Sequence, residues 1–251
     1  MSEIKFFNDL QFSNLVDDDS EFIPLLSSED EEQMNTEETP EELAILPLRN
    51  TVLFPGVVIP ITVGRDKSIK LIKDAYKKDK IIGVVSQKDV AIEDPSFEDL
   101  NKVGTIALIV KMLRMPDGNT TVIIQGKKRF HLDEVTQQEP YFKAKITSFE
   151  EIRPAAEDKE FQAMVGSLKD ISLQIIQHSP NIPSEAAFAI KNIESPSFLI
   201  NFISSNMNAE VAEKQQMLEV ADLKQRAVLV LQQLTKELQM QELKNQIQSK
   251  V

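Results

Sequence analysis

The residue types that carry most enzyme chemistry are scarce in this sequence, and their spacing indicates no catalytic site. A nucleotide phosphate loop needs two glycines five positions apart, the second followed by lysine and then serine or threonine, so that backbone N–H groups cradle the phosphates. No two of the seven glycines have this spacing, and Gly126-Lys127 is followed by Lys128. The absence of cysteine excludes disulfides and thiolate metal sites. We therefore expect no bound cofactor and no metal in this chain.

The remaining candidate groups have simpler structural interpretations. His131 falls in a strand pattern, and His178 falls in the last turn of a predicted helix, where the helix dipole favours a cation. Arg49 and Asn50 suit an ion pair and a turn. A Ser–Lys dyad is compatible with the composition, but no glycine-flanked serine supports one. The sequence therefore predicts a polypeptide that hydrolyses neither ATP nor peptides.

The elements that would position any site are organised around Leu46–Gly56, which predicts a short strand, a stiff apolar turn and a return strand. Pro47 and Pro55 fix φ and lack a backbone donor, so neither suits a central position in a sheet. Pro55-Gly56 is a turn dipeptide, because proline presets the first central position and glycine tolerates positive φ.

Residues 43–152 have a mostly strand-like pattern with one helix. Asp66 can cap that helix, in which apolar residues recur every three or four positions. The longest strand, Gly104–Met115, would place its even-numbered apolar residues from Ile106 to Met112 on one face. Pro116–Asn119 signals a hairpin, and residues 126–128 predict a tight break before the next strand. About seven short strands with one helix predict a small mixed β-barrel or pseudobarrel of the PUA-like kind.

The pattern becomes helical after Arg153-Pro154, and residues 155–251 predict an α-helical bundle. The chain thus belongs to the α+β class, with two subdomains meeting near this proline. The last helix should begin near Asp222 and run to Val251, roughly 45 Å at 1.5 Å per residue. Its apolar stripe from Leu223 to Leu238 should pack on the other helices, and we expect the rest to project from the bundle.

Charge is distributed unevenly along the chain. Residues 1–43 carry fourteen acidic residues and one lysine, a net charge of −13, whereas the remainder carries +1. Residues 1–42 therefore predict a disordered acidic tail, because like charges repel and little apolar surface offsets the entropy of ordering. No secretory signal and no apolar run long enough for a bilayer is present. We expect a cytoplasmic protein with no membrane or nucleic-acid partner.

Several segments resemble one family. The opening Leu46–Gly56, "LPLRNTVLFPG", resembles the start of the amino-terminal domain of Lon, the ATP-dependent serine protease. Further similar segments lie in the same order as in that family: Val84–Lys88, Asp99-Leu100, Val103–Ala107, Pro116–Gly118 and Gln125–Phe130. The resemblance covers about Glu42 to the end. It does not extend to the phosphate loop of the ATPase module or to the Ser–Lys peptidase domain, so it implies the substrate-recognition and assembly region of such a protease.

The resemblance implies a function in gathering unfolded or damaged proteins for a hexameric ATPase and peptidase that uses ATP and Mg²⁺. Such a domain needs modest affinity for exposed apolar segments. Candidate contacts are apolar residues that a loop or edge could leave exposed: Leu53, Phe54, Pro55, Met112, Leu113 and Met115.

Two alternatives stay open at this point. The first is a stand-alone Lon-domain binding or adaptor protein with no enzyme attached. The second is an RNA-binding module, since small mixed barrels also bind RNA. The near-neutral charge of residues 44–251 and the presence of only two tyrosines and no tryptophan do not favour RNA.

Overall fold

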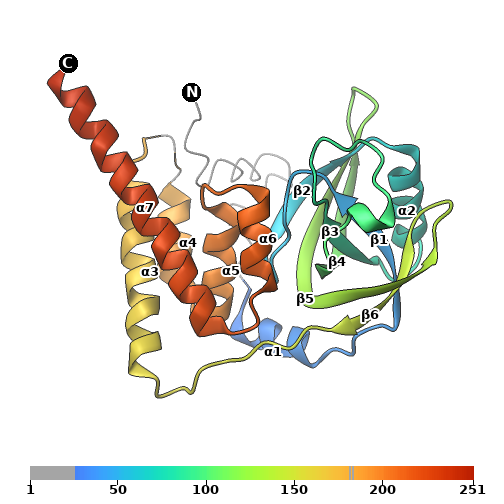
Figure 1. Ribbon diagram of the computed structural model, residues 1–251, viewed down its shortest axis with the longest axis horizontal. Helices are drawn as coiled ribbons and strands as arrows, with labels where there is room; N and C mark the ends of the chain where they lie inside the picture. The colour runs from blue at the N-terminus through green and yellow to red at the C-terminus, as the bar shows by residue number, and fades with distance from the viewer. Residues whose placement is uncertain (1–25, 181, 183) are drawn as a thin grey trace. The chain divides into compact units, whose positions relative to one another are not determined.

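The computed structural model describes residues 26–180, 182 and 184–251, which form two compact units (Figure 1). The β-rich unit contains Ser28–Glu150 together with Val211–Glu219. The helical unit contains Glu151–Glu210 and Val220–Val251. The predicted α+β class, with strands first and a long helix last, is confirmed. The domain limits 43–152 and 155–251 stay a prediction, and the β-rich compact unit differs from them by two added helices, residues 28–36 and 211–219.

The β-rich unit is built on one six-stranded sheet. Its strands are β1 (Glu42–Leu48), β2 (Val58–Val63), β3 (Ile81–Ser86), β4 (Val103–Arg114), β5 (Thr120–Gln137) and β6 (Lys143–Ser148). Their order is β2-β5-β4-β3-β1-β6, and β5 also pairs with β6, so five of the strands close into a barrel and β2 extends beside the first half of β5. Because β1 and β3 run parallel while the other pairs are antiparallel, the barrel is mixed, as predicted.

Two irregularities in β4 and β5 differ from the sequence prediction. The expected break at residues 126–128 is a β-bulge within the single strand β5, which lets the strand bend without ending. A second register shift between Ile109 and Lys111 changes the alternation of β4. Val110 is therefore 49% exposed, while Met112 packs against the core, so the expected single face from Ile106 to Met112 is wrong.

The sheet buries side chains on both faces. Helix α2 (Asp66–Tyr76) contributes Leu71 and Ile72 to one core cluster, with alternate residues of β1, β3, β4 and β5. The other cluster lies around Phe130 and includes the short helix η2 (Phe97–Asp99) through Phe97. A Cβ at Gly104 would lie 2.4 Å from the Val84 carbonyl oxygen and 2.8 Å from the Phe130 ring, so only glycine fits there.

Part of the predicted acidic tail is ordered. Residues 1–25 lie outside the described residues, but Ser28–Thr36 forms the helix α1 of the β-rich unit. Met34 is buried, and the Glu37 carboxylate lies 2.8 Å from Lys127 Nζ, while Lys128 donates to the Glu37 carbonyl. The burial of Met34 and the contacts with the two lysines offset the entropy that this segment loses when it becomes ordered.

The helical unit contains α3 (Lys159–Gln177), α4 (Ser184–Asn192), α5 (Pro196–Asn206) and α7 (Leu223–Lys250). The predicted cap at Asp66 is wrong, because the N-cap residue of α2 is Arg65 and no side-chain cap bond forms there. The expected start of the last helix at Asp222 is confirmed, since Asp222 accepts from Gln225 N, and Ser195 caps α5 by accepting from Phe198 N. The remaining helix, α6 (Val211–Glu219), belongs to the β-rich unit although it lies between helices of the other unit in sequence. Gln215 holds it there by accepting from Ser86 Oγ at 2.7 Å and donating to the Val103 carbonyl at 2.9 Å.

The long helix α7 packs beyond the point expected from its apolar stripe. Gln241 is 4% exposed, and every residue from Glu242 onward is exposed. The predicted projection is therefore confirmed, but it begins after Gln241 rather than after Leu238. A polar residue extends the packed face, which a search for apolar periodicity does not detect.

Candidate functional site

The six predicted contact residues do not form one exposed surface. Leu53 is 2% exposed and Phe54 is 0% exposed, so the exposure expected of them is wrong. The backbone of their turn is held in place, because Thr105 Oγ1 donates to the Leu53 carbonyl at 2.6 Å and Gly56 N donates to the Gly126 carbonyl at 2.8 Å. Pro55 beside them is half-buried.

The three other predicted contacts lie near the tip of the β4–β5 hairpin, where Met112, Leu113 and Met115 are half-buried. Thr120, opposite the end of β4, and Gly126, beside the Leu53 turn, are six residues apart on β5, a distance of about 20 Å along a strand. The two sets are therefore too far apart to bind one side chain together.

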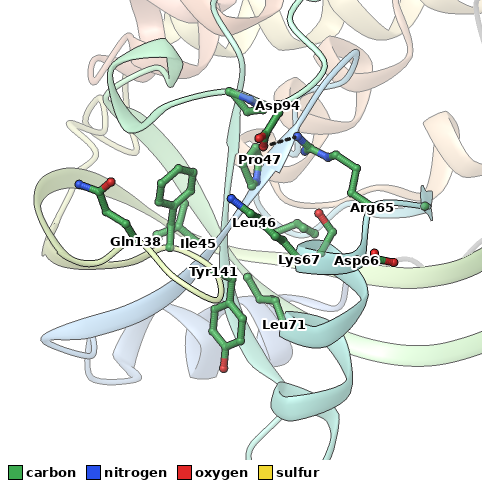
Figure 2. Close-up of a pocket in the computed structure, with 14 residues that line it drawn as sticks. Ile45, Leu46, Pro47, Arg65, Asp66, Lys67, Leu71, Asp94, Gln138 and Tyr141 are labelled. Atoms are coloured by element: carbon green, nitrogen blue, oxygen red, sulfur yellow. Dashed lines mark ion pairs between the residues drawn. The ribbon is translucent and has the colours of Figure 1, made fainter.

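A pocket of about 380 Å³ lies elsewhere in the β-rich unit, between the start of α2, the end of β1 and two loops (Figure 2). Its apolar wall is formed by the following residues: Ile45, Leu46, Pro47, Leu71, Pro95, Tyr141 and Phe142. Its polar rim is formed by these: Arg65, Asp66, Lys67, Ser68, Asp94 and Gln138. An apolar cavity with a few polar groups at its edge is the usual form of a site for a small ligand or a side chain.

The β2–α2 connection fixes one side of the pocket. Arg65 is the N-cap residue of α2 but makes no side-chain cap bond; its Nη1 instead donates to the Glu93 carbonyl at 2.6 Å. The same Nη1 lies 3.9 Å from Asp94 Oδ1, the ion pair drawn in Figure 2. Arg65 thereby joins the start of α2 to the loop that carries Asp94 and Pro95.

The β5–β6 loop forms the opposite side and is held on α2 by two contacts. Lys67 Nζ lies 2.8 Å from Glu139 Oε1, and this bond raises the pKa of Lys67. Tyr141 OH donates to Asp74 Oδ2 at 2.9 Å, which lowers the pKa of Asp74. Burial, and then the Asp74 carboxylate, raise the pKa of Tyr141. These contacts place the Tyr141 ring against the pocket wall beside Leu71 (Figure 2).

This pocket was not predicted from the sequence, because its walls come from segments far apart in the chain. No local signal indicates it, since the charged helix start Arg65-Asp66-Lys67 comes to lie beside the apolar end of β1 only after the barrel has closed. Two of the residues considered for chemistry have structural contacts: Arg49 Nε donates to the Val90 backbone carbonyl at 2.7 Å, and the His131 ring lies 4.8 Å from that of Phe149. Residues 26–180, 182 and 184–251 hold no cluster of His, Cys, Asp and Glu suited to a metal ion.

Comparison with known proteins identifies the family. Residues 42–236 match the model of the ATP-dependent protease La (LON) substrate-binding domain. The chain belongs to this family. It is 62% identical over 235 residues to the Lon protease of Flavobacterium johnsoniae, covering 94% of this chain and 29% of that protein. It is 50% identical over 231 residues to the Lon protease of Cytophaga hutchinsonii, covering 92% of this chain and 28% of that protein.

Solved structures of Lon amino-terminal domains share the fold. The domain from the Mycobacterium avium complex matches with a TM-score of 0.63 at 20% identity, covering 77% of this chain and 98% of that one. The domain from Xanthomonas campestris matches with a TM-score of 0.54 at 16% identity, covering 76% and 96%. The family match includes every residue of the pocket and ends within α7.

This chain thus corresponds to the substrate-binding domain of its Lon relatives. It spans about 29% of the length of the Flavobacterium johnsoniae protein. Within its described residues, no helix is both long enough and apolar enough to cross a membrane. The pocket beside α2 lies in the β-rich unit of this domain.

Proposed function

We propose that this chain captures exposed apolar segments of unfolded or damaged proteins for a Lon protease, and that the pocket beside α2 holds one apolar side chain of such a segment. The observation that carries the proposal is the pocket itself, in a chain that belongs to the Lon substrate-binding domain family. A cavity of about 380 Å³ has room for an aliphatic or aromatic side chain with part of its backbone.

The pocket is suited to weak binding of many different polypeptide segments rather than to tight binding of one ligand. The apolar wall attracts any large apolar side chain in proportion to the area removed from water. The rim of paired charges gives few fixed hydrogen-bond positions, so it does not select one sequence strictly. A protease that must accept many unfolded chains gains from this combination, because several copies acting together raise the overall affinity.

The Lon relatives support a proposal about the parent enzyme. We propose that the natural protein is a cytoplasmic, ATP- and Mg²⁺-dependent serine protease that assembles as a hexamer with AAA+ ATPase modules, and that this domain delivers substrates to it. The Lon relatives, which are more than three times as long as this chain, support this over a stand-alone adaptor. The rim of the pocket, with carboxylates at Asp66 and Asp94, does not favour RNA.

Photo-crosslinking from single cysteines tests the location of binding. The chain has no cysteine, so Gln138→Cys can be labelled uniquely with a benzophenone maleimide at the pocket rim. Two matched exposed positions in the same unit are Asp117→Cys, at the hairpin tip near Met115, and Glu134→Cys, on β5. Each labelled chain is irradiated with permanently unfolded, carboxymethylated α-lactalbumin.

We expect the adduct mainly from position 138. Preferential adduct formation from position 117 would mean that the pocket is not the capture site and that the hairpin residues Met112, Leu113 and Met115 bind the substrate instead. Equal adduct from all three positions would refute a defined capture site in this unit.

A further inference from the structure

The charged residues that line the pocket are two cations and two carboxylates, and a third carboxylate lies beside them. Among the lining residues, Arg65 and Lys67 are matched by Asp66 and Asp94, and Glu139 adds a third carboxylate through its bond to Lys67. The exposed rim is therefore slightly acidic even though the wall beneath it is apolar. This charge distribution favours a cationic group beside whatever apolar side chain occupies the pocket.

The two cations of the rim already have acceptors. Arg65 donates to the Glu93 carbonyl at 2.6 Å and faces Asp94 at 3.9 Å, and Lys67 lies 2.8 Å from Glu139. The carboxylates retain more accepting capacity, because each can accept several hydrogen bonds. The side chains of Asp94 and Glu139 are 72% and 71% exposed, so an incoming guanidinium or ammonium group can reach them from solvent.

The start of α2 does not reverse this preference. A helix N-terminus attracts anions, but Asp66 already places a carboxylate in the first turn of α2. A carboxylate on a bound peptide would instead lie near the Asp94 or Glu139 carboxylate, and like charges repel. An acidic flank is therefore unfavourable on the same rim that favours a basic one.

We propose that the pocket selects segments in which a large apolar residue is flanked by lysine or arginine. This inference rests on the proposed function and adds the substrate class. The apolar side chain enters the pocket, and a neighbouring basic side chain reaches Asp94 on one side or Glu139 on the other. The two carboxylates are on separate loops, so a basic residue before or after the apolar one can be used.

Three fluorescent peptides of equal length test the selection on the full 251-residue chain. Each holds a single phenylalanine flanked by arginine, by glutamine or by glutamate, and affinity is measured by anisotropy. We expect the arginine peptide to bind about three- to tenfold more tightly than the glutamine peptide, and the glutamate peptide more weakly, because each exposed ion pair contributes modestly. Raising the salt from about 0.05 M to about 0.5 M should remove most of the difference.

Rim variants locate the effect. Asp94→Asn with Glu139→Gln should bring the arginine peptide to the affinity of the glutamine peptide while leaving the latter unchanged. The matched control, Asp117→Asn with Glu134→Gln, removes two exposed carboxylates away from the pocket and should preserve the preference. Circular dichroism confirms that both variants are folded.

The outcomes separate the two proposals. If the glutamine peptide binds and competes with crosslinking from position 138 but the flanks make no difference, the charge selection is wrong and the capture site stands. If no peptide competes at position 138, the proposed function itself fails. A preference for arginine that the control variant abolishes equally would show a general effect of charge and overturn the role of Asp94 and Glu139.

Discussion

Lys224 Nζ lies 2.9 Å from Asp158 Oδ2, and this contact joins the first turn of α7 to the N-cap of α3. Seventeen residues later on α7, Gln241 donates to the Ile175 carbonyl, which is seventeen residues after Asp158. Equal spacing on both helices means that α3 and α7 run parallel and in register along the whole length of α3. The two contacts thus mark the two ends of the α3–α7 pair within the helical unit.

The contact of Gln241 with α3 determines how far α7 can be shortened without loss of stability. Deleting residues 242–251 removes only exposed positions, so we expect the melting temperature to change by no more than about 1 °C. Deleting residues 239–251 also removes Gln241, which donates to Ser179 Oγ at 2.6 Å and to the Ile175 carbonyl at 3.2 Å. That deletion should destabilise the unit by about 1–3 kcal/mol. Thermal unfolding of both proteins decides whether packing ends at Gln241.

The Asp158–Lys224 contact gives the helical unit a pH dependence. The backbone N–H of Phe161, and then Lys224, lower the pKa of Asp158, while Asp158 raises the pKa of Lys224. A carboxyl group whose pKa is lowered by folding stabilises the folded state at pH values above its unfolded pKa, near 3.9. That stability is lost as the pH falls through the folded pKa. A raised lysine pKa contributes stability that is lost only as the pH rises above about 10.4.

We therefore expect Asp158→Asn to lower the melting temperature at neutral pH by a few degrees, and by less as the pH falls through the lowered pKa of Asp158, where the unmodified chain also loses the charge. Asp170→Asn, an exposed carboxylate on the same helix, is the control. Melting curves between acid and neutral pH provide the measurement. An equal loss at every pH would mean that the carboxylate charge at position 158 has no role.

Two glycine-to-alanine variants should have opposite effects on stability, because Gly104 is crowded and Gly166 is not. Gly104→Ala should destabilise the β-rich unit by about 1–3 kcal/mol, since the new methyl group would meet the Val84 carbonyl and the Phe130 ring. Gly166→Ala on α3 has no atom within 4 Å of its Cβ and should stabilise the chain by about 0.5–1 kcal/mol. Chemical denaturation measures both. A neutral Gly104→Ala would show that strands β3 and β4 can separate at little cost.

Local chemistry made much of the fold predictable. The hairpin at Pro116–Asn119 forms because Gly118 takes φ of 89° and Asp117 Oδ1 accepts from Asn119 N, as turn rules require. The caps at Ser195 and Asp222 follow equally local rules. The mixed barrel followed from the number and length of strand patterns around one helix.

Non-local packing decided the rest. The bulge at Val110 reverses the alternation of β4, and no residue type near it signals this. The exposure of Leu53 and Phe54 was mispredicted because an apolar turn can fold inward as well as outward. The pocket joins β1, the start of α2 and the β5–β6 loop, which only the closed barrel brings together. The placement of α6 in the β-rich unit depends likewise on contacts across more than a hundred residues.

Helix α6 provides the last prediction, which concerns where the β-rich unit ends. Gln215 is buried and bonded to Ser86 and Val103, while Arg129 donates to the Leu218 carbonyl at 2.7 Å. Gln215→Leu keeps a side chain of similar size but removes the partner of the Ser86 hydroxyl and of the Val103 carbonyl. We expect a loss of about 1–3 kcal/mol, the usual cost of buried polar groups without hydrogen bonds.

Ser86→Ala separates the contribution of the two bonds. If Gln215 acts through Ser86, the double variant should cost clearly less than the sum of the single changes, because both remove the same bond. Gln216→Leu, at the neighbouring exposed position of α6, is the matched control and should be nearly neutral. Urea unfolding followed through the β-sheet signal gives all four values. Strict additivity, or an unfolding free energy unaffected by Gln215→Leu, would mean that α6 is only loosely attached and that the unit is complete at Glu150.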